Sequence, residues 1–319
     1  MRRNYKLVKD KGFVAICMAT YNGGKYLSDQ LDSIFQQTYS NWRIFVRDDG
    51  STDATTQILA TYEQKFPGKV HVLKNIPGGG NSKSNFFLVL QWVKENINPD
   101  FYMLCDQDDF WYKYKIESTI SLVKNSDEPS LVHTDLAVGN KNLDVLNESF
   151  VRYSNLKPQF RDLSHLLIQN NLTGCTMLWN KELSKKLDFH DASLISMHDW
   201  WIALVASCMG KIYYLDYPTL IYRQHQRNVV GAQKVGSLRY IFNKLSNLKD
   251  IKIQFLKTYK QAGYFKLVYG SELNIKDRKT LDEYLKIPKT SKLLKWKICI
   301  QNRFLKQSLI QLLGEFVFI

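Results

Sequence analysis

Three aspartates stand within four positions of the segment CDQDDFW, directly behind an apolar run that is typical of a buried strand. Asp106 and Asp108, two residues apart on extended backbone, can both reach one hard cation. Mg2+ and Mn2+ prefer such oxygen ligands and leave positions open for phosphate oxygens. A helix N-terminus with acids favoured by the dipole is the alternative, although capping explains one acid and not three. Asp109 is expected to point the other way, and to cap the next helix or hold the loop.

A second acidic candidate lies in the segment SMHDWW, at the start of an otherwise apolar helical stretch. Asp199 is expected to be ionised at neutral pH and could act as a general base that takes a proton from a hydroxyl group. The structural alternative is that Asp199 simply caps this helix. Trp200 and Trp201 are either part of the core or an apolar platform for a ligand.

Three further polar clusters follow apolar runs. Asp49, in VRDDGSTDA, could accept a hydrogen bond from a ligand ring N–H, or the cluster is only a turn in which Ser51 or Asp53 caps a helix. Lys83, in GGGNSKSN, could meet an anion at a helix N-terminus, or this is a flexible loop. His225, in YRQHQRNVVG, could bind metal or phosphate beside Arg223 or Arg227, or it is a solvated loop histidine.

The elements that must position these residues alternate between short apolar runs and amphipathic stretches. This βαβα alternation predicts an α/β fold with a doubly wound parallel sheet, whose ligands lie outside the carboxyl ends of the strands. The polar clusters at 20–24, 48–53 and 106–109 would then face one crevice. The strands are expected at 13–19, 42–47, 69–74, 101–105, 130–136, 173–180 and 211–216, and the helices at 25–37, from 53, at 86–96 and at 198–210.

The length and composition of the chain limit the classes of protein to which it can belong. A chain of 319 residues can bury a full core, and its five cysteines are scattered singly, which is typical of reduced core cysteines and makes a zinc site unexpected. The apolar run near the N-terminus is too short for a membrane span, and no signal peptide is expected. These features predict a cytoplasmic protein.

Most of the net charge of +14 lies in the C-terminal region. Residues 232–319 hold 18 Lys and Arg against 6 Asp and Glu, in helical stretches that Pro288 should divide. Such a basic amphipathic region could lie on an anionic membrane surface, or be an ordinary helical appendage or a dimerisation surface. Nucleic-acid binding is a weaker alternative, because regular aromatic interleaving is missing and an acidic crevice repels phosphate unless metal is present.

Four motifs, TYNGG with the following DDGSTD, CDQDDFW, MHDWW and LIYRQHQRNVVG, occur in an order and spacing that resemble the family 2 inverting glycosyltransferases of the GT-A fold. They look most like bacterial rhamnosyltransferases of cell-wall and capsular polysaccharide synthesis. The resemblance implies a Rossmann-like, mainly parallel sheet in a catalytic domain at 1–231, with a helical C-terminal region at 232–319. The QxxRW motif of processive synthases is absent, which argues for one sugar added per encounter.

The resemblance also implies roles for single residues. Asp199 would deprotonate the acceptor hydroxyl, and His198 stands where relatives carry the first acid of a pair. Asp106 and Asp108 would bind Mg2+ or Mn2+, with His225 completing the metal and diphosphate site. The residues expected at the nucleotide sugar are Ala19, Thr20, Tyr21, Asn22, Asp49, Lys83, Asp106, Arg223 and His225.

The expected donor is dTDP-β-L-rhamnose, from which inversion would give an α-L-rhamnoside. UDP-galactose, UDP-N-acetylglucosamine or a UDP-furanose are alternatives, and a nucleotidyltransferase with a similar crevice is a more remote one. The expected acceptor is a glycan carried on undecaprenyl diphosphate, which would bring the enzyme to the inner face of the membrane. A homo-oligomer is also possible.

Overall fold

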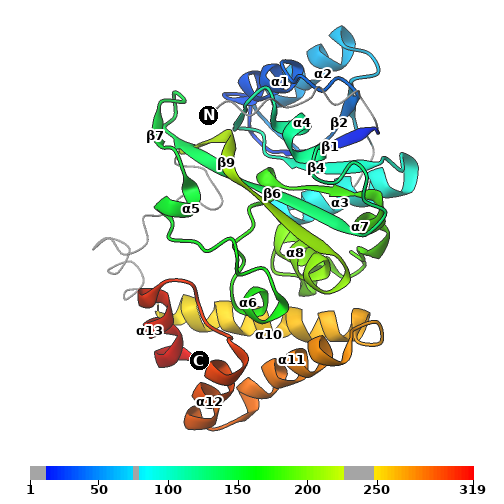
Figure 1. Ribbon diagram of the computed structural model, residues 1–319. Helices are drawn as coiled ribbons and strands as arrows, with labels where there is room; N and C mark the ends of the chain where they lie inside the picture. Colours follow the sequence, from blue (N-terminus) through cyan, green and yellow to red (C-terminus); the bar gives the residue numbers. More distant parts are fainter. Residues whose placement is uncertain (1–11, 75–78, 226–247) are drawn as a thin grey trace. The chain divides into compact units, whose positions relative to one another are not determined.

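The computed structural model describes residues 12–74, 79–225 and 248–319 (Figure 1). The predictions for the basic N-terminus at 1–11, for Gly78 and for Arg227 lie outside these residues. The chain divides into two compact units. The first unit comprises Met1–Ser149, Gly174–Lys186 and Tyr213–Gly231, and the second comprises Phe150–Thr173, Leu187–Ile212 and Ala232–Ile319. Because the second unit also takes two earlier segments, the domain division at residue 231 stays a prediction.

Four parallel strands form one half of the sheet in the first unit, in the order β3-β2-β1-β4. Met18 of β1 pairs with Val46 of β2 and Cys105 of β4, so the carboxyl ends of these strands meet at one edge. Every residue of β1 is buried, as expected for a strand covered on both faces. The strands are β1 (Val14–Thr20), β2 (Trp42–Asp48), β3 (Val70–Val72) and β4 (Phe101–Cys105), and the helices between them are α1 (Leu27–Phe35), α2 (Thr55–Lys65) and α3 (Ser82–Asn96).

The sheet continues in the order β4-β8-β6-β9-β5. Strand β8 pairs antiparallel with β4 and β6, β5 pairs antiparallel with β9, and β7 pairs antiparallel with β6. The two-residue strand β5, absent from the sequence prediction, pairs Phe110 with Ile221 and Trp111 with Leu220 of β9. This pairing brings the end of β9 beside residues 106–109. The bounds are β5 (Phe110–Trp111), β6 (Ser130–Gly139), β7 (Val145–Asn147), β8 (Leu178–Asn180) and β9 (Lys211–Arg223), with α4 (Lys115–Ile120), the 3-10 turn η1 (Gly174–Thr176) and α7 (Lys181–Lys186).

The second unit contains helices gathered around an aromatic core. Trp201 of α8 is fully buried and stacks on Tyr264 of α10, with ring centroids 5.3 Å apart. Pro288 lies in a short 3-10 turn between two helices, which confirms the predicted division. The bounds are α5 (Phe150–Tyr153), α6 (Leu163–Ile168), η2 (Ala192–Leu194), α8 (His198–Met209), α10 (Leu248–Tyr269), α11 (Ile275–Lys286), η3 (Ile287–Lys289), α12 (Lys292–Asn302) and α13 (Leu309–Phe318).

The hydropathy of these helices bears on membrane insertion. Among the residues described, no helix has both the length and the apolar character that crossing a bilayer requires.

Candidate active site

The turns after β1 and β2 hold each other through side-chain contacts. Oδ1 of Asp48 accepts hydrogen bonds from Oγ1 of Thr20 at 2.8 Å and from Oγ of Ser51 at 2.6 Å. Asn22 has a left-handed backbone, with φ of 48°, and its Oδ1 accepts a hydrogen bond from the Thr52 amide at 2.8 Å. Asp48, which was not a predicted site residue, therefore shapes the turn that carries its neighbour Asp49.

Asp49 ties the Gly-rich loop to the sheet. Its Oδ1 accepts hydrogen bonds from Nη1 of Arg47 at 2.9 Å and from the Gly79 amide at 2.5 Å. The same Arg47 nitrogen contacts Oδ1 of Asn85 in α3 at 2.7 Å. Within the described part of the chain, Oδ2 of Asp49 makes no protein hydrogen bond, so this oxygen can accept one from a ligand.

Gln107 joins the turn after β1 to the DQDD loop, the name used here for residues 106–109. Its Oε1 accepts a hydrogen bond from the Tyr21 amide at 2.9 Å, and its Nε2 donates to the Tyr21 carbonyl at 3.0 Å. A Cβ on Gly23 would lie 2.2 Å from Oε1 of Gln107, so this contact requires glycine. The Tyr21 side chain is 57% exposed, which leaves its ring accessible to a flat ligand.

The structure separates the predicted metal ligands into two groups. Nε2 of His225 lies 2.7 Å from Oδ2 of Asp108. Asp106 instead belongs to a group with Asp109 and Cys175, in which one ligand atom from each lies within 4.8 Å of the others. The donor set at the loop, half-buried carboxylates with one imidazole, fits the chemistry that Mg2+ or Mn2+ prefers.

The prediction that Asp109 caps the next helix is wrong, while its alternative role in holding the loop stays a prediction. Its carboxyl group is fully buried, and the N-cap of the next helix, α4, is Tyr114. Burial raises the pKa of Asp109 well above its usual range, and the charges of Asp106 and Asp108 raise it further, while the thiol of Cys175 and the Arg223 amide lower it. The expectation that Asp109 points away from Asp106 assumed that the period-two alternation of the strand continues into the loop. The loop does not keep this alternation, because ligand atoms of Asp106 and Asp109 lie within 4.8 Å of each other.

A buried lysine accompanies this acid. Lys115 lies with Nζ 3.2 Å from Oγ1 of Thr219 and 4.8 Å from the centroid of the Trp111 ring. Burial lowers the pKa of Lys115 to about 8, although nearby acidic groups oppose this shift. The interior below the DQDD loop thus holds a positive group that offsets part of its negative charge.

Lys83 and Arg223, both predicted to bind the donor, differ in their surroundings. Lys83 is half-buried in the first turn of α3, which begins at its N-cap Asn81. Arg223 is buried, and its guanidinium nitrogens contact Asp29, Asp108 and Lys141. For both residues, contact with the donor stays a prediction.

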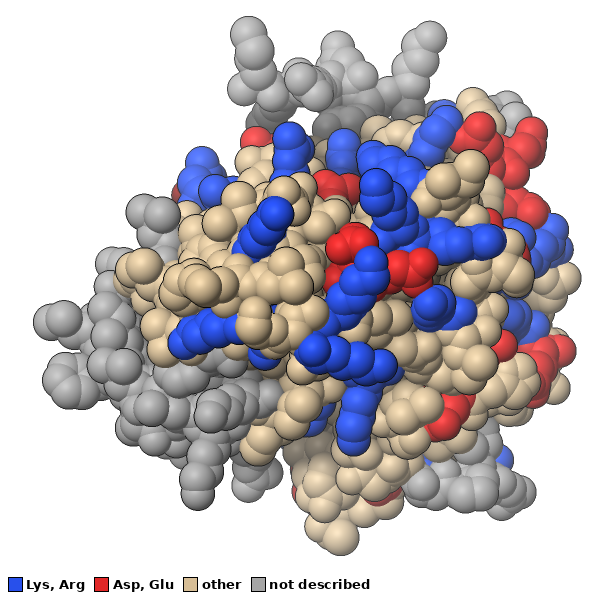
Figure 2. All heavy atoms as spheres, turned by 90° about the horizontal axis from the view of Figure 1, so that it is seen from below, with Lys and Arg blue, Asp and Glu red and all other residues tan. Residues whose placement is uncertain are grey.

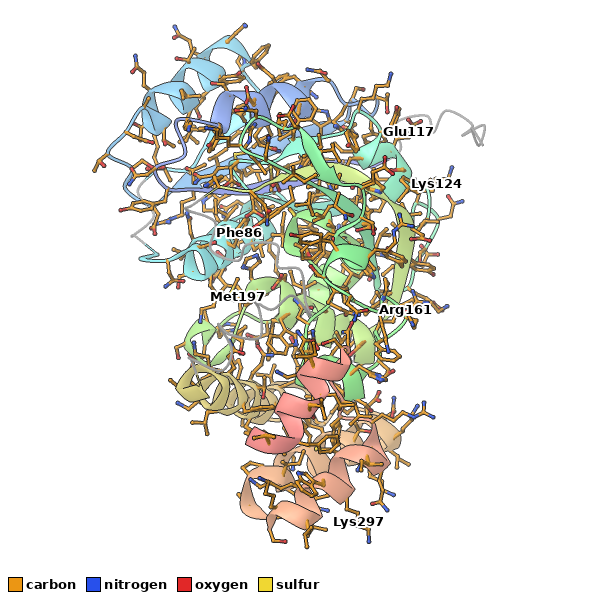
Figure 3. The ribbon with its side chains drawn as sticks, turned by 90° about the vertical axis from the view of Figure 1, so that its left-hand side faces the viewer. Phe86, Glu117, Lys124, Arg161, Met197 and Lys297 are labelled. Atoms are coloured by element: carbon orange, nitrogen blue, oxygen red, sulfur yellow. The ribbon has the colours of Figure 1, made fainter. Side chains whose placement is uncertain are left out.

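Asp199 lies in the second unit, in the first turn of α8. The N-cap of α8 is Met197, labelled in Figure 3, so the interpretation of Asp199 as the N-cap is wrong. Oδ1 of Asp199 accepts a hydrogen bond from the Trp200 amide at 2.6 Å. Burial lowers the pKa of His198 to about 3, so this imidazole is neutral beside the acid.

The two tryptophans after Asp199, Trp200 and Trp201, differ in burial. Trp201 belongs to the core, where its Nε1 donates to the Asp188 carbonyl at 2.7 Å. Trp200 is half-buried, and its Nε1 donates to the Leu166 carbonyl at 2.6 Å. Of the pair, only Trp200 keeps an exposed surface that can serve as a platform.

Comparison with known proteins decides the family. The family model described as glycosyl transferase family 2 matches residues 15–187, more than half of the chain. The chain belongs to glycosyl transferase family 2. The dTDP-rhamnosyl transferase RfbG of Shigella flexneri is 33% identical to this glycosyltransferase over 233 residues, which are 70% of this chain and 76% of that protein.

Two further matches concern the sequence and the fold. An uncharacterized glycosyltransferase of Rickettsia typhi is 29% identical over 251 residues, covering 76% of this chain and 71% of its own length. The crystal structure of S. aureus TarS 1–349 in complex with UDP covers 95% of this chain and 90% of TarS 1–349, with a TM-score of 0.51 and 16% identity. At this identity the likeness concerns the fold alone, and the predicted GT-A fold is confirmed.

Proposed function

We propose that this family 2 glycosyltransferase transfers L-rhamnose from dTDP-β-L-rhamnose to a hydroxyl group of a glycan acceptor, with inversion at the anomeric carbon. The observation that carries the chemistry is the Asp108–His225 contact of 2.7 Å beside Asp106, at the carboxyl ends of the parallel strands. The identity of 33% to RfbG of Shigella flexneri favours the rhamnosyl donor.

The first unit would bind the donor. Oδ2 of Asp49 accepts a hydrogen bond from the base N–H, while the exposed Tyr21 ring stacks on the base. Lys83 and the N-terminus of α3 face the diphosphate, since backbone N–H groups there attract anions. Asp106, Asp108 and His225 would hold Mg2+ or Mn2+, which when bound supplies positive charge that stabilises the leaving diphosphate.

Asp199 of the second unit would act as the base. As the acceptor oxygen forms a bond to the anomeric carbon, its proton passes to the Asp199 carboxylate and the bond from that carbon to the diphosphate oxygen breaks. The nucleoside diphosphate leaves with the electron pair. Neutral His198 adds no positive charge that would make Asp199 a weaker base.

A UDP sugar is the second candidate donor. It is favoured by one observation, the crystallisation of the TarS 1–349 relative with UDP. Membership of glycosyl transferase family 2 leaves the nucleotidyltransferase and nucleic-acid-binding alternatives without support.

The acceptor is proposed to be lipid-linked, with the C-terminal helices on an anionic membrane surface at the cytoplasmic face. On α12, Leu293, Lys297 and Ile300 are exposed at helical spacing, and Lys297 projects from the helix in Figure 3. The segment Lys292–Asn302 contains no acidic residue, and Glu315 of α13 is buried. Figure 2 shows Lys and Arg side chains gathered over the face seen from below, with acidic side chains between some of them.

Release of nucleoside diphosphate from a panel of nucleotide sugars tests the donor. The purified enzyme with Mn2+ should release dTDP from dTDP-β-L-rhamnose faster than UDP from UDP-galactose or UDP-N-acetylglucosamine. Faster release of UDP would replace the rhamnosyl donor while keeping the transferase chemistry. Release of pyrophosphate would instead restore the nucleotidyltransferase alternative.

A further inference from the structure

Arg223 lies buried where three segments of the first unit meet. Its Nε donates to the Asp108 carbonyl, its Nη1 to the Lys141 carbonyl and its Nη2 to Oδ2 of Asp29, each at 2.8 Å. Only 2% of the residue is exposed. Because the guanidinium group is planar and rigid, three such contacts fix its orientation. Arg223 thereby holds the main chain of the DQDD loop against α1, which carries Asp29.

Tyr26, at the N-cap of α1, links this arginine to His225. The guanidinium carbon of Arg223 lies 4.5 Å from the centroid of the Tyr26 ring, within the range of a cation–π contact. The His225 ring also lies near Tyr26, with the ring centroids 4.9 Å apart and an angle of 32° between the ring planes. His225 in turn contacts the Asp108 carboxylate.

These contacts form a closed circuit of four residues. Arg223 holds the main chain of Asp108, while His225 contacts its side chain, and Tyr26 contacts both Arg223 and His225. A carboxylate fixed through both its main chain and its side chain loses little conformational freedom when it binds a ligand, and such preorganisation raises affinity.

We propose that Arg223 and Tyr26 are positioning residues that hold the Asp108 carboxylate and the His225 imidazole as one ligand pair for a divalent cation. This inference rests on the proposed function, because it takes that pair to be part of the metal site. Neither Arg223 nor Tyr26 needs to touch the cation or the donor. Partners that orient metal ligands commonly change metal affinity by about 10- to 100-fold when they are removed.

Binding of Mn2+ in the presence of dTDP, followed by the electron paramagnetic resonance signal of free Mn2+, tests the circuit. Tyr26→Ala and Arg223→Lys should each raise the Kd for Mn2+ by about 10-fold or more. Tyr26→Phe keeps the ring that contacts Arg223 and His225 and should bind as the wild type does. Arg43→Lys is the matched control, because Arg43 makes a similar contact, 5.1 Å from the Phe13 ring, in the same unit.

A second readout separates positioning from loss of fold. Saturating Mn2+ should restore most of the kcat of Tyr26→Ala, which a global structural defect would not permit. If Arg223→Lys does not fold, the Kd of Tyr26→Ala for Mn2+ tests the inference by itself. Tyr26 is only half-buried, so its replacement is expected to leave the fold intact. Wild-type protein that binds no Mn2+ would refute the proposed metal site itself. Wild-type binding with unchanged Kd in both Tyr26→Ala and Arg223→Lys would overturn only the positioning inference.

Discussion

Nε2 of His225 lies 2.7 Å from Oδ2 of Asp108, although 117 positions separate the two residues in the chain. The short strand β5 brings them together, because its pairing of Phe110 with Ile221 places the end of β9 beside the DQDD loop. An imidazole nitrogen and a carboxylate oxygen at this distance form a hydrogen bond, and a divalent cation would compete for the same lone pairs. The contact therefore leads to a direct prediction about metal binding.

Replacing one ligand should weaken metal-dependent donor binding. Asp108→Asn and His225→Gln keep the approximate shape of the site but remove a charge or the imidazole nitrogen. In calorimetric titrations with dTDP, we expect the enhancement of affinity by Mn2+ to fall by about 10-fold or more in each variant. Equal affinity with Mn2+ and with chelator in the wild type would contradict the metal assignment. Asp144→Asn, an exposed carboxylate in the β6–β7 hairpin of the same unit, serves as the control.

Removal of the base should separate binding from catalysis. Asp199→Asn keeps the size of the side chain but cannot take a proton, so transfer should fall by about 100-fold or more, while the Kd for dTDP with Mn2+ stays near the wild-type value. Transfer rates and calorimetry measure the two effects. Near-normal transfer by this variant would remove Asp199 from the base role. Asp188→Asn, whose carboxylate lies in the same unit, controls for a general effect of charge.

A methyl group at Gly23 should disturb the link between the two loops. Because the added Cβ would lie 2.2 Å from Oε1 of Gln107, Gly23→Ala must displace that side chain from Tyr21. We expect donor affinity to fall by about 10-fold, or roughly 1.4 kcal/mol. The control is Gly263→Ala in α10, where a Cβ meets no heavy atom within 4 Å and should stabilise the helix by about 0.5–1 kcal/mol. Unchanged donor affinity in Gly23→Ala would show that the Gln107 contact is dispensable.

Two buried groups in the second unit predict opposite pH effects on stability. Burial lowers the pKa of His198 from 6.5 to about 3, so the stability present above pH 6.5 is lost progressively as the pH falls toward 3. Burial raises the pKa of Glu315 from 4.5 to about 7, so stability present below pH 4.5 is lost as the pH rises toward 7. Each effect amounts to about 1.4 kcal/mol per pH unit within its window.

Urea unfolding at about pH 5.5 and about pH 7.5 measures this difference. Relative to the wild type, His198→Phe should gain stability at the lower pH compared with the higher one, and Glu315→Gln should shift in the opposite direction. The comparison of two pH values within one variant removes any general loss of packing. Shifts of the same sign in both variants would contradict the assignment.

Binding to vesicles tests the proposed membrane contact. Leu293→Asp combined with Ile300→Asp removes apolar surface from α12 and repels anionic lipid, so co-sedimentation with vesicles of phosphatidylglycerol and phosphatidylcholine should be lost. Leu146→Asp in β7, an exposed leucine of the first unit, should bind as the wild type does. If the wild type does not bind vesicles, and the double variant has a different molar mass from the wild type in light scattering, then α12 is an interface between copies.

The parallel half of the sheet could be predicted from the sequence because each of its strands is an unbroken apolar run followed by a polar turn. The strand predicted at 173–180 begins instead with a 3-10 turn, and only Leu178–Asn180 form a strand. Strand β5 was missed because two residues carry no periodicity. Its pairing partner lies more than 100 residues away, so no local pattern could reveal it.

The site was predictable in its residue types and less so in its contacts. Carboxylates and a histidine after apolar runs pointed to the DQDD loop and to His225. Gln107 and Tyr26 were not predicted from the sequence. Gln107 contacts the backbone of Tyr21, 86 positions away, and Tyr26 contacts His225 through its ring, so no local pattern indicates either role. The N-cap role expected for Asp109 was wrong, since a loop does not keep the alternation of the strand before it.

Release of dTDP from dTDP-β-L-rhamnose, measured before and after removal of divalent metal, tests the central claim most directly. The enzyme treated with chelator should lose nearly all release, and added Mn2+ or Mg2+ should restore it in the wild type but not in Asp108→Asn. Release that continues unchanged without metal, or that is restored equally in Asp108→Asn, would contradict a metal-assisted rhamnosyltransferase site at the DQDD loop.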